Sequence, residues 1–274
     1  MRKLLPLLLI AALTACASPK PKPRLDDAHF LLLGEVHDNA AIHDMRAGVL
    51  RNLLADGKRT VVVFEQMGRD RDAALAAAPR DAEAIADAGA LDRKGWRWPL
   101  HKPVIDAALA GKAGIVGGNL ERDKARALVR DGESAWPADL AQLRANSVWG
   151  DAQQKAMVDD IDQGHCGAMP AQMMPGMVLA QRGRDAAMAQ AMLAARAAGA
   201  ERVVLIAGNG HVRRDLAVPL YLRAAGVPAN DIFSAAYMEQ GMEQGSDRAK
   251  GAYDAVVRLP AAEREDPCKA LLKK

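Results

Sequence analysis

Two stretches of the sequence, LLLGEVHDN at residues 31–39 and LIAGNGHVRRD at residues 205–215, share one pattern. In each, a short apolar run stops at a glycine, and a histidine follows: Gly34 leads to His37, and Gly208 leads to His211. Short apolar runs that do not alternate with polar residues are typical of strands buried on both faces of a parallel sheet. The repeated Gly-x-x-His ending therefore predicts two buried strands that bring their histidines to one ligand at the same edge of a sheet.

The rest of the chain extends this pattern to a whole domain. Apolar runs bounded by turn residues predict strands at residues 29–34, 60–65, 113–119, 202–208, 231–237 and 253–259. Between them, stretches that end at a glycine predict helices at residues 40–57, 102–111, 121–132, 175–199 and 213–226. This alternation predicts an α/β fold, a mainly parallel central sheet flanked by helices, with a helical excursion at about residues 136–200.

The N-terminal residues carry signals for export. Residues 1–15 have the basic start, the short apolar run and the small-residue end of a signal peptide, and LTAC at residues 13–16 resembles a bacterial lipobox. We expect a lipidated Cys16, a Pro/Lys-rich tether over residues 16–26 and a single domain over residues 27–274. Ala17 favours the outer membrane by resemblance to Gram-negative sorting rules. An ordinary secretory signal with an incidental cysteine is the alternative.

The charge balance argues against one class of partner. The formal net charge is +3, and removal of Arg2 and Lys3 with the signal peptide leaves +1. The sequence also contains no basic helix with interleaved aromatic residues, so nothing indicates nucleic-acid binding. Contact with a membrane is expected only through the lipid anchor.

Two cysteines remain after Cys16. In an oxidising periplasm Cys166 and Cys268 can pair, which would tie the C-terminal tail to the loop that carries His165. Free thiols or a metal-binding role for Cys166 are the alternatives, because sequence alone does not give the distance between the two residues.

Acidic and imidazole side chains follow four of the predicted strands. The strand ends carry Glu35 with His37, then Glu65, Asn119 and His211. In open parallel sheets, ligands bind beyond the carboxyl ends of the strands. We therefore expect Glu35, His37, Glu65 and His211 to line one pocket, whereas ordinary loop polarity would leave them unrelated.

Three kinds of chemistry fit such a set of side chains. Glutamate and histidine can ligate a divalent metal such as zinc or manganese. A glutamate–histidine pair can act in general acid–base catalysis. Imidazole can ligate haem iron or form hydrogen bonds with the haem propionates. The sequence has no His-Glu-x-x-His helix, no Gly-rich phosphate loop and no Gly-x-Ser-x-Gly elbow. These absences argue against the common zinc peptidases, nucleotide-binding proteins and serine hydrolases.

Three other segments carry candidate ligand contacts. GWRWPLHKP at residues 95–103 concentrates aromatic residues, and Trp98 and His101 could either face a planar ligand or simply cover the sheet. QGHCGAMPAQMMPGM at residues 163–177 sets His165 among methionines, which are either adaptable ligand surface or flexible core. In AQRGRDAAMA, at residues 180–189, Arg184 could meet a propionate or lie on a solvated helix face.

His29 and His43 are expected at a strand edge and on a helix surface, without a functional role.

These segments together resemble a known family. LLLGEVHDN, VVVFEQM, GNL, HCGAMP, AQRGRDAAMA and VVLIAGNGHVRRDLAVPLYL, in this order over roughly residues 28–240, are similar to the ChaN-like haem-binding lipoproteins. That family belongs to a wider superfamily with the Tiki and TraB proteins. The positions that match its motifs are Glu35, His37, Glu65, Asn119, His165 and His211.

The resemblance implies iron-regulated haem binding at the bacterial surface or in the periplasm. It implies haem stacked at a homodimer interface, with a tyrosine of one subunit on the iron and a histidine of the other at the propionates. An outer-membrane receptor for haem or iron is an expected partner. The family's WP-x-Y-x-P segment has a tyrosine where this chain has His101, so His101 is a candidate iron ligand. Further candidate haem contacts are His37, His165, Arg184, His211 and Trp98.

Two functional hypotheses follow, together with a purely structural one. The first is a haem-binding lipoprotein of the envelope that catalyses no reaction. The second is a metal-dependent periplasmic hydrolase with Glu35, His37, Glu65 and His211 around the metal, and with Glu35 or Glu65 as the base. The third, a structural lipoprotein, leaves the acids and imidazoles at the strand ends unexplained.

Overall fold

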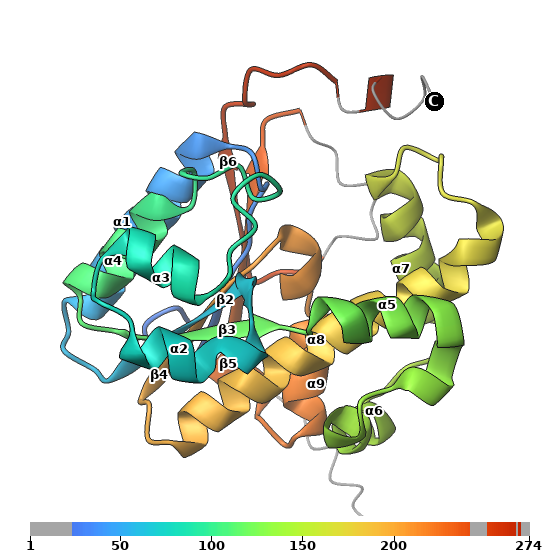
Figure 1. Cartoon of the computed structure of the whole chain (residues 1–274), viewed down its shortest axis with the longest axis horizontal. Coiled ribbons are helices and arrows are strands. Elements are labelled where there is room, and N and C mark those ends of the chain that lie inside the picture. Colours follow the sequence, from blue (N-terminus) through green and yellow to red (C-terminus); the bar gives the residue numbers. More distant parts are fainter. Residues whose placement is uncertain (1–23, 242–250, 267, 270–274) are drawn as a thin grey trace, which may run out of the picture.

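The computed structural model describes residues 24–241, 251–266 and 268–269, and one parallel sheet organises them (Figure 1). The strands are β1 (Phe30–Leu33), β2 (Thr60–Gly68), β3 (Gly114–Asn119), β4 (Arg202–Ile206), β5 (Ile232–Glu239) and β6 (Ala255–Leu259). They pair in the order β3-β2-β4-β1-β5-β6, and each pair is parallel. The six strands expected from the sequence, and the α/β fold, are confirmed.

The central strands are apolar along their whole length because both faces of the sheet are covered. Alternate side chains of each strand point to opposite faces. Leu31 and Leu33 pack with residues of α1 (Ala40–Leu54), α3 (Ala82–Ala88) and α4 (Lys102–Ala110). Leu32 packs on the other face with residues of α5 (Arg122–Asp131), α8 (Met174–Ala197) and α9 (Val218–Ala224). The short helix α2 (Asp72–Ala77) follows β2.

The helical excursion is present between β3 and β4. After α5 the chain forms α6 (Ala141–Asn146), α7 (Asp151–Gly164) and the long helix α8. A separate small apolar cluster centred on Met157 and Ile161 joins α7 to the start of α8, with Met169, Met174 and Met177 packed against it. These methionines therefore act here as apolar packing between the two helices.

Helix α1 begins at a side-chain cap. The side-chain oxygen of Asn39 accepts a hydrogen bond from the Ile42 amide at 3.1 Å, which satisfies one of the free N–H groups of the first turn. The buried side of α1 includes polar side chains. His43 and Arg46 are fully buried, whereas Met45 is 44% exposed.

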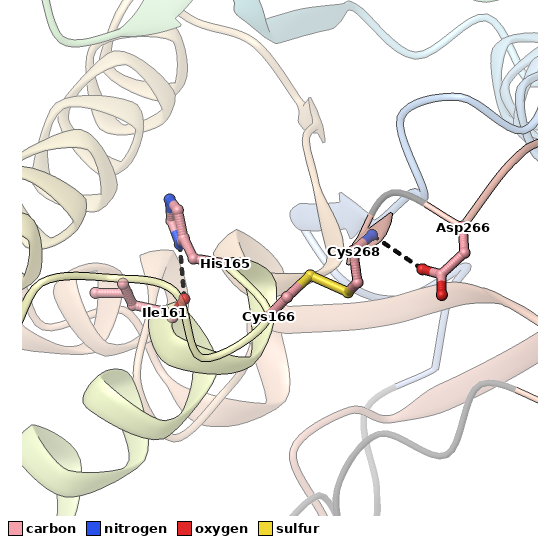
Figure 2. Close-up of a disulfide and its surroundings, with 5 residues drawn as sticks. All are labelled: Ile161, His165, Cys166, Asp266 and Cys268. Carbon is pink, nitrogen blue, oxygen red and sulfur yellow. Dashed lines mark hydrogen bonds between the residues drawn. A yellow bond between two sulfur atoms is a disulfide. The ribbon is translucent and has the colours of Figure 1, made fainter. Parts of the chain in front are cut away.

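A disulfide joins Cys166 to Cys268, with 5.5 Å between the two Cα atoms (Figure 2). The structure therefore has Cys166 and Cys268 as a disulfide, and not as free thiols or with Cys166 in a metal-binding role. The signal peptide, Cys16 and most of the tether lie outside the described residues. Within the described part of the chain, no helix combines the length and the apolar character that a membrane crossing needs.

Glycine at position 117 lets β2 and β3 approach closely. A side-chain carbon on Gly117 would overlap the backbone of Gly68, where β2 shifts its register against β3. Replacing Gly117 by alanine should therefore lower the free energy of unfolding by about 1–3 kcal/mol, because backbone must move to make room. Denaturant-induced unfolding measures this change.

The matched control is Gly164→Ala, at a helical glycine of α7 with open space around it. Alanine is favoured over glycine in helices by up to about 1 kcal/mol, so this variant should be no less stable than the parent. Equal losses in the two variants would contradict the close approach of β2 and β3.

Candidate functional site

The carboxylate of Glu35 is the centre of the site. Glu35 follows β1 and is only 2% exposed. Its Oε1 atom lies 2.7 Å from Nδ1 of His37, 3.2 Å from Nε2 of His101 and 3.1 Å from Nε2 of Gln66. A carboxylate oxygen only accepts hydrogen bonds, so each of these nitrogens donates. His37 therefore carries its proton on Nδ1 and leaves Nε2 unprotonated.

A buried cation compensates the charge of Glu35. Arg46 of α1 donates to the second oxygen of Glu35, and its other terminal nitrogen donates to the Leu33 carbonyl at 3.2 Å. His43 lies beside it: Nε2 of His43 donates to the His37 carbonyl at 3.0 Å, and Nδ1 accepts from Arg46 at 2.9 Å. The N-terminal half of α1 therefore supports the loop that carries Glu35 and His37.

The two buried imidazoles near Arg46 are neutral. Desolvation lowers the pKa of His101 to about 3, helped by the positive charge of Arg46. Desolvation also lowers the pKa of His43 to about 4, helped by the neighbouring His101. The charges of Glu35 and Arg46 therefore balance each other inside this part of the site.

A second cluster surrounds the other Gly-x-x-His histidine. Nδ1 of His211 lies 2.6 Å from Oδ1 of Asp185 on α8, and its Nε2 lies 3.3 Å from Oε1 of Glu65 on β2. Burial opposes a charge on His211, but the two carboxylates outweigh it and raise the pKa of His211. Burial likewise opposes the charge of Glu65, yet His211 and the Gly208 amide, which donates at 2.7 Å, lower the pKa of Glu65.

The two clusters meet at His37. A methyl group on Gly208 would lie 2.9 Å from Cε1 of His37 and 3.7 Å from Oε2 of Glu65, so only glycine leaves space for this contact. The ring of His37 also meets Trp96 edge-on, at 4.7 Å between centroids. The side chain of His37 is 49% exposed, in contrast to the other imidazoles of the two clusters.

A pocket of about 690 Å³ opens beside these residues, at the carboxyl ends of β2 and β3. Its inner wall includes Glu65, Gln66 and Asn119, and Trp96 forms one side. Apolar side chains of Met67 and Leu120 also line it, and the rim carries charged residues of both signs, including Arg71, Arg122 and Arg126.

The structure brings most of the expected strand-end residues together. Glu35, Glu65, His37 and His211 lie in adjoining clusters, and Asn119 donates to the Glu65 carbonyl at 2.9 Å. His101, the candidate iron ligand, is buried. Its side chain is 1% exposed, because the residue directly precedes α4, packs edge-on against Trp96 and points at Glu35.

Three other expected contacts lie elsewhere. Trp98 donates to Glu83 at 3.1 Å and stacks under Arg93, so Trp96 rather than Trp98 lines the pocket. His165 follows α7, and its Nδ1 donates to the Ile161 carbonyl at 2.7 Å next to the disulfide (Figure 2). Arg184 is partly exposed on α8, and none of the contacts among the described residues joins it to His37 or His211.

Four members of the site were not predicted from the sequence: His43, Arg46, Asp185 and Gln66. The expectation that His43 lies on the helix surface was wrong, because the ring is fully buried against Arg46. One signal was available: His43 and Arg46 are three positions apart, so they share a helix face with Ile42, Leu50 and the other core residues. Asp185 had no such signal, because only the tertiary fold brings α8 to His211.

Lowering the pH should destabilise the protein through its buried neutral histidines. The unfolded chain binds a proton at each histidine below a pH of about 6.5, whereas the folded pKa values are about 4 for His43 and about 3 for His101. Between these limits the unfolded state binds more protons, so this contribution is complete above the unfolded pKa and is lost as the pH falls. Replacing His101 by glutamine should flatten the pH dependence of the unfolding free energy by about 1 kcal/mol per pH unit near pH 5.5.

Urea-induced unfolding at several pH values measures this slope. His29→Gln is the control, because the side chain of His29 is 44% exposed and lies apart from the cluster. If His101→Gln and the parent protein had the same slope, His101 would not be held neutral in the fold.

Comparison with known proteins identifies the family. A sequence model described as haem-binding uptake, Tiki superfamily, ChaN matches residues 23–222. No curated protein sequence matches. Among solved structures, one of cofacial haem binding to ChaN of Campylobacter jejuni is 18% identical, with a TM-score of 0.66 over 83% of this chain and 86% of that one.

Other solved structures are more distant. An erythromycin esterase variant in its open conformation is 17% identical, with a TM-score of 0.43 over 90% of this chain and 80% of that chain. A protein from Bacillus cereus is 11% identical, with a TM-score of 0.46 over 78% of this chain and 66% of the other. Because the family model covers most of the sequence, this chain belongs to the ChaN family of haem-binding uptake proteins in the Tiki superfamily.

Proposed function

We propose that this protein binds haem and that His37 is the residue that ligates the iron. The proposal rests on the hydrogen bonding and the exposure of the His37 ring. Its Nδ1 donates to the buried carboxylate of Glu35 at 2.7 Å, while the side chain remains 49% exposed. Metal-ligating histidines commonly donate their second ring N–H to a carboxylate, which fixes the tautomer and makes the free nitrogen a better ligand.

The iron ligand is assigned to His37 rather than to His101. The ring of His101 is buried, and its Nε2 is committed to Glu35 at 3.2 Å. His101 therefore supports the ligand through Glu35 instead of reaching the iron.

The pocket lies next to His37, because Trp96, which lines it, meets the His37 ring edge-on. Trp96 offers aromatic surface to a flat ring, and the nearly buried side chains of Met67 and Leu120 complete the apolar part of the wall. The guanidinium groups of Arg71, Arg122 and Arg126 lie on the rim, where propionate carboxylates could meet them. These three arginines replace Arg184 as the candidate propionate partners.

The place of this activity in the cell is part of the same proposal. The signal peptide and lipobox predict a protein anchored by lipid in the Gram-negative envelope, on the outer membrane. We propose a role there in haem or iron acquisition, with binding of haem by a homodimer and transfer to or from an outer-membrane receptor.

A metal-dependent hydrolase is the second candidate, and one geometric feature favours it. Ligand atoms of Glu35, His37 and His101 all lie within 4.8 Å of one another, close enough to surround a divalent ion such as zinc or manganese. In that case Glu65 would be the candidate base. The positive charge of Arg46, in contact with Glu35, opposes a second cation at this position and favours the haem proposal.

Haem titration of the mature chain, followed by visible absorption, tests the proposal. We expect a saturable shift of the Soret band. His37→Ala should weaken binding by at least about tenfold and change the spectrum, because it removes the proposed iron ligand. His101→Gln should keep the spectrum of the parent complex.

The same preparation should be analysed for bound metal before haem is added. Less than about a tenth of an equivalent is expected. No saturable shift in the parent protein would overturn the haem proposal, and about one equivalent of zinc or manganese, lost in Glu35→Gln, would establish the metal site instead.

A further inference from the structure

The chain after β6 forms a strap across the end of the sheet. We define the C-terminal strap as residues 260–266 with residues 268 and 269. Figure 1 shows it leaving β6 and running towards the side of the molecule that carries α7. Most of its residues are exposed, so apolar packing does not hold it in place.

One end of the strap is fixed at the turn that carries His37, residues 34–39. The side-chain amide of Asn39 donates to the Pro260 carbonyl at 2.9 Å. Nε of Arg264 lies 3.3 Å from Oδ2 of Asp38, which directly follows His37. Two consecutive residues of the turn are thus held by the strap.

Glu239, at the end of β5, connects these contacts. Its two carboxylate oxygens each accept a hydrogen bond from one terminal nitrogen of Arg264, at 2.7 Å. Oε1 also accepts hydrogen bonds from the Ala262 amide at 2.9 Å and from the Asn39 side chain at 2.8 Å. Burial would raise the pKa of Glu239, but these hydrogen bonds outweigh it and lower the pKa to about 2. The carboxylate therefore stays ionised and keeps Arg264 in place.

The other end of the strap is covalent. Cys268 is bonded to Cys166 in the turn that follows α7, and its amide donates to Oδ1 of Asp266 at 2.9 Å (Figure 2). The disulfide thus ties the helical excursion to the strap, whose residues Pro260 and Arg264 contact the His37 turn. A chain terminus without such a tie is poorly ordered as a rule.

We propose that the C-terminal strap is a positioning element for the His37 turn, and that Arg264 and the Cys166–Cys268 disulfide are the residues through which it acts. The strap fixes Asp38 and Asn39, while Glu35 fixes the ring of His37. With the two residues after His37 held by the strap and its ring held by Glu35, the backbone of His37 has little freedom, and its Nε2 keeps one direction. The role in haem binding rests on the proposed function, but the ordering of the turn does not.

Two strap variants and two controls test this inference. Arg264→Gln removes the bidentate ion pair, and the double variant Cys166→Ser with Cys268→Ser removes the covalent tie. Arg264→Lys keeps the charge without the fork geometry and should restore part of the effect. Glu263→Gln is the matched control, because it changes an exposed neighbour on the same strap.

The first measurement is amide hydrogen exchange of residues 34–39 in the protein without haem. Exchange should accelerate at least about tenfold in Arg264→Gln and in the double serine variant, while the amides of β4 keep the parent rate. Glu263→Gln should match the parent at both places. Unchanged exchange in the turn in both strap variants would overturn the inference.

The second measurement is the rate of haem loss to an excess of an apo-globin acceptor. Loss should be about tenfold faster in the strap variants, with a changed Soret position, and intermediate in Arg264→Lys. A parent protein that binds no haem would refute the proposed function, yet hydrogen exchange would still decide whether the strap orders the turn. Equal haem loss in all variants would show that the strap does not act on the ligand.

Discussion

The site depends on one buried ion pair, between Glu35 at the end of the first strand and Arg46 inside the helix that follows it. Both side chains are withdrawn from water, so each charge needs the other, and removing one partner of such a pair commonly costs about 3–5 kcal/mol. Three hydrogen bonds from His37, His101 and Gln66 complete the shell of Glu35. The carboxylate is thereby kept charged and immobile at the point where a ligand would have to be held.

The two Gly-x-x-His turns look alike in sequence and differ in chemistry. His211 lies between two carboxylates, and its raised pKa makes it a buried cation that holds Glu65 and Asp185 in place. His37 has one carboxylate partner and an open face. One turn therefore serves as a fixed electrostatic support, and the other presents the ring that can reach a ligand. Gly208 links them, because its missing side chain is the space into which His37 fits.

The surrounding architecture limits how the His37 turn can move. Helix α1 lies on one side and is capped by Asn39, which also contacts the strap and Glu239. The strap in turn is tied to the helical excursion through the disulfide. A site at the carboxyl end of a parallel sheet is usually built from loops, which are the mobile parts of such folds. In this protein, the turn contacts both the helix that follows it, through His43, and the C-terminal strap, through Asp38 and Asn39.

The sequence by itself determined the sheet and the four strand-end residues Glu35, His37, Glu65 and His211. Uninterrupted apolar strands must be buried on both faces, and the glycines that end them fix where polar residues can first appear. Only the tertiary structure decided which of those side chains are buried and which partners they contact. His101 was a candidate iron ligand and is buried against Glu35, whereas His43 was expected at the surface and lies in the core. The reason is that burial and the choice of partner come from segments far apart in the chain: α8 brings Asp185 to His211, and the C-terminal strap brings Arg264 to Asp38. A local pattern of residues contains no information about such contacts.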